Sequence, residues 1–545
     1  MGGFPHRQRL FAFLFQNFSD LAVKHGFQRF FKEVKQGFMA VADADADESG
    51  FGRRIKNAVF WRSGSQIVAQ LISWASTLAV IRILSPADYG LFAMTQVILT
   101  FLTFLNGYGL ISALVQSETL EQFRLRQAFG LMLLLNGALA ILQVAVMAPL
   151  AADYYDQPLV ANLLRIQALL YLATPFIALP EVLMGRSLDF RRPALANLIA
   201  AAAAAAVAIG GALSGWGVWT LVFAPIAGFW VKAVGYMLAT RLFIWPSFDF
   251  RGTGGIIGFG ASLLGSQLFW MFQSQADIFI GGRMLPPHEL GLYAEALFLT
   301  QIFAAKFIPA LNDVAFPAYA RMQGDVGRLA WSFCKAVKLI LLIACPLYVG
   351  MAVTAGPLIE TLLGRKWIEM APLISILALA MPFMTVQVMF APASNALGRP
   401  GTTARIAGVG AVLMPAAFLI GIPFGAAGLA WAWALAFPLL TLVTIRMAGK
   451  PMGVSYADIG RSALPAVASS ALMAGIVLLV GKILPPMPAF LTLALMVLAG
   501  ALSYAVILFG LARETADELL RLLGRKQVPA PPQGESGALD IIPQS

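Results

Sequence analysis

Four cationic side chains lie within long apolar runs of the sequence, where a free charge is unfavourable: Arg62, Arg165, Lys232 and Lys306. At the centre of a membrane helix, an unpaired Lys or Arg costs about 2.5–3.5 kcal/mol on insertion scales. Such a residue is tolerated when it meets an anion, and arginine makes paired hydrogen bonds to phosphate. These positions predict a substrate-binding site for a group with concentrated negative charge.

Each of the four cations also has a structural interpretation. Lys232 and Lys306 would be neutralised by ion pairs inside the protein, whereas Arg62 and Arg165 would escape the apolar phase if their long stems reached the lipid headgroups. Acidic residues at similar depth are candidate partners: Glu181, Asp277, Glu295 and Asp313. Both interpretations stay open at the level of the sequence.

The acidic residues suggest a second kind of chemistry. An ionisable group inside a membrane is a functional-site hypothesis by default, so Asp277 and Glu295 are candidates for coupling to a cation or a proton. The chain contains no Walker A pattern, which argues against ATP as the direct energy source. Its three histidines and two cysteines form no cluster with metal-ligand spacing, so neither a metal nor another cofactor is expected.

Two apolar segments carry stripes of polar residues. At about 100° per residue, the members of each stripe fall within about 60–80° of one another. The stripes are Arg62, Gln66, Gln70, Ser73 and Thr77 in one segment, and Ser262, Ser266, Gln273 and Asp277 in the other. Because polar groups facing lipid are costly, the stripes predict a protein interior or a water-filled cavity, with Gln66 and Gln273 as further candidate substrate-binding residues. For any single Gln or Ser, an ordinary hydrogen bond between helices is the alternative.

The elements that must position these residues are membrane helices. Of 545 residues, 59% are hydrophobic and 12% charged, and fourteen apolar segments, from 57–83 to 489–511, are long enough to cross a bilayer of about 30 Å. The Lys and Arg residues of the short loops alternate in density as a cytoplasmic N-terminus requires. This loop bias explains the net charge of +11 without nucleic-acid binding.

A repeated motif indicates how the helices are organised. RILSPADYGLFA, residues 82–93, returns as RMLPPHELGLYA, residues 283–294, and ATPF at 173–176 returns as AMPF at 380–383. The echoes keep their order, which indicates duplication of a six-helix unit. Since six is even, both copies have the same orientation and are related by an axis along the membrane normal. We therefore expect an all-α integral membrane protein with two pseudo-symmetric six-helix lobes around a central cavity, plus two C-terminal helices.

The repeated arginines, Arg82 and Arg283, have two open interpretations. In the structural one, each precedes a turn fixed by proline, after which Asp88 or Glu289 starts the next helix at its favourable N-terminal end. In the functional one, they form a gate at the outer face whose ion pairs break during transport.

The domain division follows from these segments. It comprises an amphipathic or dispensable cytoplasmic extension (1–56), the first lobe (57–245), the second lobe (246–450), two further helices (451–512) and a disordered cytoplasmic tail (513–545).

Three motifs carry a family resemblance: residues 82–93 as quoted, DIFIGGRML with LGLYAEA in 277–296, and FPAYARMQGD at 316–325. Over roughly residues 57–450 the chain resembles the lipid-linked oligosaccharide flippases of bacterial polysaccharide export, a branch of the multidrug, oligosaccharidyl-lipid and polysaccharide exporter superfamily. The resemblance implies a multi-pass protein of the inner membrane, with both termini cytoplasmic. It also implies alternating access that moves undecaprenyl-pyrophosphate-linked oligosaccharide repeat units across the bilayer for exopolysaccharide, O-antigen or capsule synthesis.

The implied partners are the lipid-linked oligosaccharide, membrane lipids, and the polymerase and export proteins of the same process. A cation-coupled multidrug exporter of the same superfamily is the alternative, although it would favour an acidic or apolar cavity. An enzyme is the weakest interpretation, because the loops predicted outside are too short to hold catalytic groups.

Overall fold

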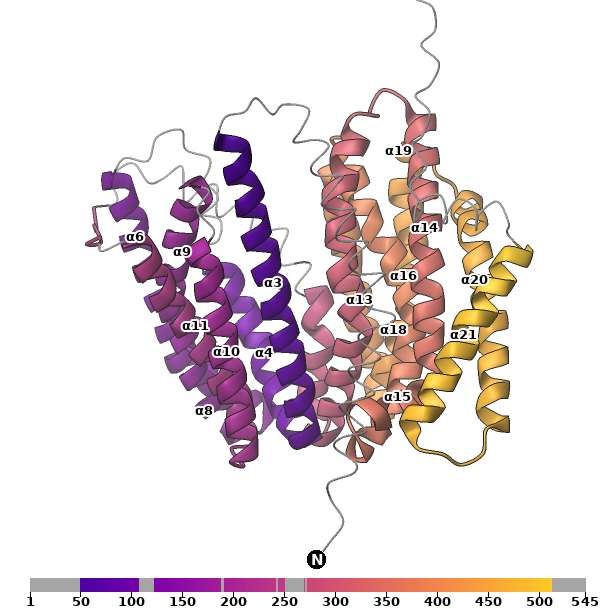
Figure 1. The fold of residues 1–545 in the computed structure, drawn as a ribbon, viewed down its shortest axis with the longest axis horizontal. Helices are drawn as coiled ribbons and strands as arrows, with labels where there is room; N and C mark the ends of the chain where they lie inside the picture. The colour runs from indigo at the N-terminus through magenta and orange to yellow at the C-terminus, as the bar shows by residue number, and fades with distance from the viewer. Residues whose placement is uncertain are drawn as a thin grey trace, which may run out of the picture.

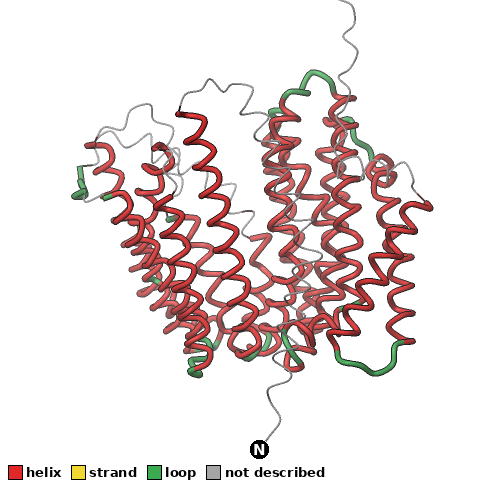
Figure 2. The backbone as a smooth tube through the Cα atoms, viewed as in Figure 1, coloured by secondary structure: helices red, strands yellow, loops and turns green. Residues whose placement is uncertain are grey.

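The computed structural model describes residues 50–106, 122–187, 191–241, 244–249, 269 and 272–511. The N-terminal extension and the C-terminal tail therefore lie outside the described residues, as do Ser262 and Ser266 of the second polar stripe. The described chain is helical and contains no strand, which confirms the predicted all-α class (Figure 2).

The first lobe contains six membrane-spanning segments, two of which are interrupted. Its helices are α3 (Gly50–Ile83), α4 (Pro86–Leu105), α6 (Gln122–Leu142) continued by a π-helical turn and α7 (Ala148–Tyr155), α8 (Pro158–Gln167) with α9 (Leu169–Ser187), α10 (Arg191–Leu213) and α11 (Trp219–Thr240).

The second lobe repeats this order and is followed by two further helices. It contains helical residues 272–284, α13 (Pro287–Ala320), α14 (Val326–Val353) with α15 (Ala355–Leu362), a 3-10 turn (Arg365–Met370) leading into α16 (Ala371–Ala396), α17 (Pro400–Gly421) and α18 (Gly425–Thr444). A π-helical turn and the short α19 (Lys450–Met452) lead to α20 (Tyr456–Ile483) and α21 (Ala489–Leu511), which pack on α14 at the side of this lobe (Figure 1).

Eleven helical stretches of the described chain are long and apolar enough to cross a membrane. One of them, Pro400–Met452, contains both α17 and α18, which fold back on each other at a 3-10 turn (Ile422–Phe424). The 34-residue α13 and helical residues 272–284 are not among the eleven. If α17 and α18 are counted as two helices, and α13 and the helix that contains residues 272–284 are added, the eleven stretches correspond to the fourteen segments predicted from the sequence.

Corresponding helices of the two lobes pack against corresponding neighbours. In the first lobe, α9 packs on α6 and on α11, and α10 packs on α11; in the second, α16 packs on α14 and on α18, and α17 packs on α18. Equivalent helices thus occupy equivalent places, as the sequence repeat predicted.

The repeated motifs bring the lobes together at one end of the molecule. At Gly90 of α4, an added Cβ would lie 1.8 Å from the carbonyl oxygen of Pro287, and at Gly291 of α13 it would lie 1.8 Å from the carbonyl oxygen of Pro86. Only glycine permits such backbone contact. We call this reciprocal contact of residues 86–90 with 287–291 the lobe junction. Towards the opposite end, where α3 begins, the ribbons of the two lobes separate (Figure 1).

Substitution Gly90→Ala should destabilise the described conformation by about 1–3 kcal/mol, because the methyl group overlaps the backbone of the other lobe. Thermal unfolding of the full chain in detergent measures the effect. Gly137→Ala in α6 is the matched control, since a Cβ there meets nothing within 4 Å and alanine favours a helix. Equal midpoints for the two variants would show that the lobe junction contributes nothing to this conformation.

Candidate functional site

A cavity of about 660 Å³ lies between the lobes. It is lined by α3, α4, α10 and α11 of the first lobe and by residues 274–278 and α13 of the second. Tyr89 and Ala93 line it within one turn of Gly90, so the cavity lies beside the lobe junction. We call it the central cavity. Its polar lining includes Ser73, Thr77, Gln96, Gln275, Glu295 and Gln301.

The polar stripe of α3 is only partly directed into this cavity. Ser73 and Thr77 line it as expected, whereas Gln66 is exposed and lines none of the three cavities described for this part of the chain. In the second stripe, Gln273 faces α17, where a Cβ on Gly410 would lie 2.2 Å from its side-chain oxygen. This glutamine therefore packs between helices, the alternative that was open for any single polar residue.

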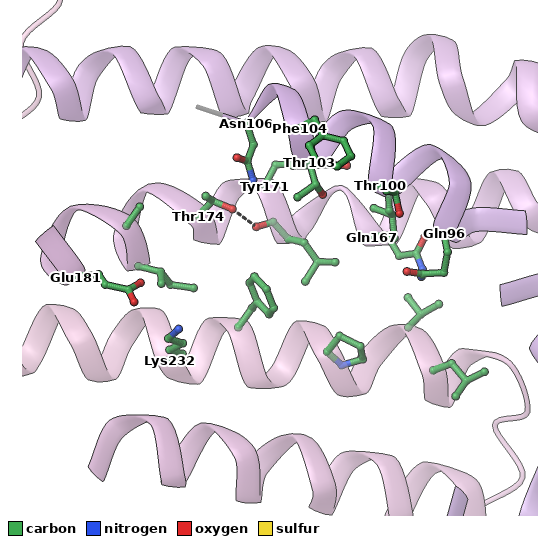
Figure 3. Close-up of a pocket in the computed structure, with 18 of the residues that line it drawn as sticks. Gln96, Thr100, Thr103, Phe104, Asn106, Gln167, Tyr171, Thr174, Glu181 and Lys232 are labelled. Atoms are coloured by element: carbon green, nitrogen blue, oxygen red, sulfur yellow. Dashed lines mark hydrogen bonds between the residues drawn. The ribbon is translucent and has the colours of Figure 1, made fainter. Parts of the chain in front are cut away.

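A second cavity, of about 720 Å³, lies inside the first lobe between α4, α8, α9 and α11 (Figure 3). We call it the lobe cavity. Lys232 of α11 and Glu181 of α9 lie at one end of it, and Gln96 and Gln167 lie at the other. It adjoins the central cavity, because Phe92, Gln96, Leu221 and Pro225 line both.

The four predicted cations do not gather at one described point. Lys232 is half-buried in the lobe cavity, with its Nζ 5.0 Å from the ring centroid of Tyr236. Arg165 is exposed, donates a hydrogen bond of 3.0 Å to Asn162 in its own helix and lines no described cavity. Arg62 and Lys306 belong to α3 and α13, but their side chains lie outside the described part of the structure. The structure thus separates Lys232 from Arg165.

The two candidate coupling residues have different surroundings. Glu295 of α13 is half-buried and lines the central cavity. Asp277 is fully buried within the second lobe, where Tyr293 Oη donates a hydrogen bond of 2.7 Å and Trp433 Nε1 one of 3.2 Å to its Oδ2. The backbone N–H of Ile278 donates to the other oxygen at 2.8 Å. Water in the central cavity can reach Glu295, whereas Asp277 is enclosed by neutral donors.

Arg82 reaches from the first lobe into the second. Its Nε donates a hydrogen bond of 2.6 Å to the carbonyl oxygen of Leu362, and a second nitrogen donates to that of Thr361, both at the C-terminal end of α15. The last carbonyls of a helix lack intrahelical partners and carry its negative dipole end, so a cation there is favourable.

Arg283 makes the equivalent bond in the other direction. Its Nη1 donates 2.7 Å to the carbonyl oxygen of Tyr154 near the end of α7, an eight-residue helix like α15. We call these two contacts the arginine clamps. The ion pairs expected for a gate are not formed in the described structure, because Asp88 closes a capping box with Ser85 at the start of α4.

Sequence reasoning missed several partners at this end. Lys366 Nζ donates a hydrogen bond of 2.8 Å to the carbonyl oxygen of Ile83, and Trp367 Nε1 donates one of 2.9 Å to that of Ile81. Both cap the end of α3 from the second lobe. The only hint in the sequence was a basic pair, Arg365 and Lys366, in a loop otherwise expected to be poor in positive charge.

The comparisons with known proteins agree with this architecture. The succinoglycan biosynthesis transport protein ExoT of Rhizobium meliloti (strain 1021) is 26% identical over 66% of this chain and 73% of its own length. The lipopolysaccharide biosynthesis protein WzxC of Escherichia coli (strain K12) is 21% identical over 58% of this chain and 65% of its own length, just under two thirds. The solved structure of lipid II flippase MurJ, in an inward closed conformation, shares the fold with a TM-score of 0.67, at 14% identity, over 83% of this chain and 98% of that one.

A family model also matches more than half of the chain. It covers residues 79–372, which include the lobe junction, both arginine clamps and most of the residues that line the central cavity. The chain is therefore a multi-pass membrane protein that belongs to the polysaccharide biosynthesis protein family.

Proposed function

We propose that this protein is a flippase that moves undecaprenyl-pyrophosphate-linked oligosaccharide repeat units across the bacterial inner membrane. The observation that carries the proposal is the central cavity, which lies between two like-oriented lobes beside the lobe junction and carries polar groups such as Gln96, Gln275 and Glu295. A glycan headgroup needs such a wet path, whereas its polyprenyl tail is soluble in lipid. The relatives named for polysaccharide and lipopolysaccharide synthesis support this class of substrate.

Transport in this proposal proceeds by alternating access and without chemical conversion of the substrate. With the N-terminus in the cytoplasm, the lobe junction lies at the periplasmic face and the described conformation opens inward. Rocking of the lobes would break the arginine clamps and part the glycines, which opens the cavity outward. The polymerase and export proteins of the pathway would then receive the delivered glycan.

Coupling is assigned to Glu295 in preference to Asp277. A coupling residue must exchange its ion with water during the cycle, and Glu295 lines the central cavity. The three donors around Asp277 give that carboxylate a structural role in joining residue 277 to α13 and α18.

Depletion of the protein should trap lipid-linked oligosaccharide in the cytoplasmic leaflet, because the headgroup cannot cross the apolar phase unaided. An enzyme or lectin that cannot cross membranes, added to spheroplasts and to inverted vesicles, reports the exposed fraction. Re-expression of the full chain is the control. An unchanged leaflet distribution, accompanied by accumulation of cationic dyes in the depleted cells, would instead support the multidrug exporter alternative.

Glu295→Gln should remove any acceleration of flipping by an imposed proton or cation gradient, since a neutral amide cannot exchange the ion. Flipping in reconstituted vesicles with and without the gradient measures this. Glu360→Gln is the control, because Glu360 pairs with Arg365 away from the cavity. If Glu295→Gln retains the full gradient effect and Asp277→Asn loses it, the assignment of Glu295 is wrong.

Arg82→Gln and Arg283→Gln should each open the periplasmic end more often, by about tenfold or more, because the first removes two charge-assisted hydrogen bonds between the lobes and the second removes one. A cysteine introduced at Thr77 in the central cavity, with an impermeant thiol reagent added outside cells, reports the open population. Arg365→Gln is the control, since Arg365 bonds only within the second lobe. Labelling rates equal to this control would show that the arginine clamps do not hold the gate.

A further inference from the structure

The lobe cavity differs in chemistry from a cavity inside the second lobe. A cavity of about 870 Å³ in the second lobe, between α14, α16, α18 and α20, is lined almost wholly by apolar side chains. Its polar groups Ser375 and Thr441 are bonded to backbone carbonyls. The lobe cavity instead presents amides and hydroxyls along its length, including Gln96, Thr100, Thr103 and Thr174 (Figure 3). The cavity of the first lobe is therefore the more polar of the two, although apolar side chains also line it.

Two buried amides of the lobe cavity lack part of their hydrogen bonding. Gln167 is 1% exposed, and its nitrogen donates 3.1 Å to Thr95, but its oxygen has no partner. Asn106, at the end of α4, is 4% exposed, and its side-chain oxygen also has no partner. Buried polar atoms are nearly always satisfied by protein, by water or by a ligand. Both amides line the lobe cavity, so their unbonded acceptors point to an occupant that donates hydrogen bonds.

The charges of the lobe cavity limit what that occupant is. Among its lining residues, Lys232 is accompanied by Glu181 at the same end, so the two formal charges cancel. A lining without net charge attracts a phosphate only weakly. The polar amides would make unfavourable contacts with an apolar polyprenyl chain. A neutral polyhydroxyl compound fits the lack of net charge and also the unbonded acceptors, because its hydroxyls can donate hydrogen bonds to the amide oxygens.

Aromatic rings complete the match. Phe92, Phe104, Tyr171 and Phe229 line the lobe cavity beside the amides. The C–H faces of a pyranose ring are apolar and pack against aromatic faces while its hydroxyls remain free for the polar groups. The volume of about 720 Å³ falls within the range of about 300–1,000 Å³ typical of small-ligand sites.

We propose that the lobe cavity is a sugar-binding subsite, in which Gln167 and Asn106 accept hydrogen bonds from the glycan while the rest of the substrate stays in the central cavity. The choice of a glycan as ligand rests on the proposed function. Gln96 stands at the boundary of the two cavities and so contacts the first sugars to enter.

The test uses the full chain in lipid nanodiscs and two probes. One is the glycan released by mild acid from lipid-linked oligosaccharide of depleted cells; the other is undecaprenyl pyrophosphate without sugar. Gln167→Met and Asn106→Leu keep side-chain size and remove the acceptors. Each should weaken binding of the released glycan by about tenfold and leave binding of the sugar-free lipid unchanged.

Gln143→Met is the matched control. Gln143 is also fully buried in the first lobe, its nitrogen donates to the carbonyl oxygen of Leu164, and its oxygen also lacks a partner, but it does not line the lobe cavity. Its loss should affect thermal stability as much as loss of Gln167 and leave both probes bound normally. Equal weakening of the two probes by Gln167→Met, or no effect on the glycan, overturns the subsite.

The same preparation separates this inference from the proposed function. Parent protein that binds no released glycan, yet flips lipid-linked oligosaccharide in vesicles, overturns the subsite alone. Parent protein that binds the glycan through Gln167 but flips no lipid-linked substrate supports the subsite and contradicts the proposed function.

Discussion

Backbone meets backbone at the lobe junction, and the rest of the architecture is arranged around that contact. Gly90 and Gly291 let α4 and α13 approach until the carbonyls of Pro86 and Pro287 lie where side chains would otherwise be. Each glycine faces the proline turn of the other lobe, so both copies of the motif contribute to the same contact. The central cavity lies beside this contact, where Tyr89 and Ala93 of α4 line it.

The arginine clamps add directional bonds on either side of this contact. Arg82 and Arg283 do not pair with carboxylates; they donate to carbonyls at the ends of α15 and α7. A hydrogen bond to a helix end is strong enough to hold a conformation and leaves no bare carboxylate when it breaks. Asp88, near Arg82 in the sequence, instead closes the capping box of α4.

Much of the fold could be predicted because it depends on features that are local or repeated. Long apolar runs predict membrane helices, and the echo of residues 82–93 in 283–294 predicts two lobes of like orientation. The candidate site could be predicted less well, because helical spacing shows which residues share a face but not which neighbour that face meets. Gln66 and Gln273 belong to the predicted stripes, yet one is exposed and the other packs on Gly410. The partners Tyr293 and Trp433 of Asp277 come from two other helices and carry no signal of their own.

The exchange of contacts between lobes has a consequence for inheritance. Each half of the chain exposes, on its own, a glycine that fits only the other half and an arginine whose acceptor lies across the interface. Neither half can therefore drift in sequence or be swapped for that of a distant relative without losing complementary surfaces. Two lobes that began as copies of one unit have become obligate counterparts, and selection on either one is felt by both.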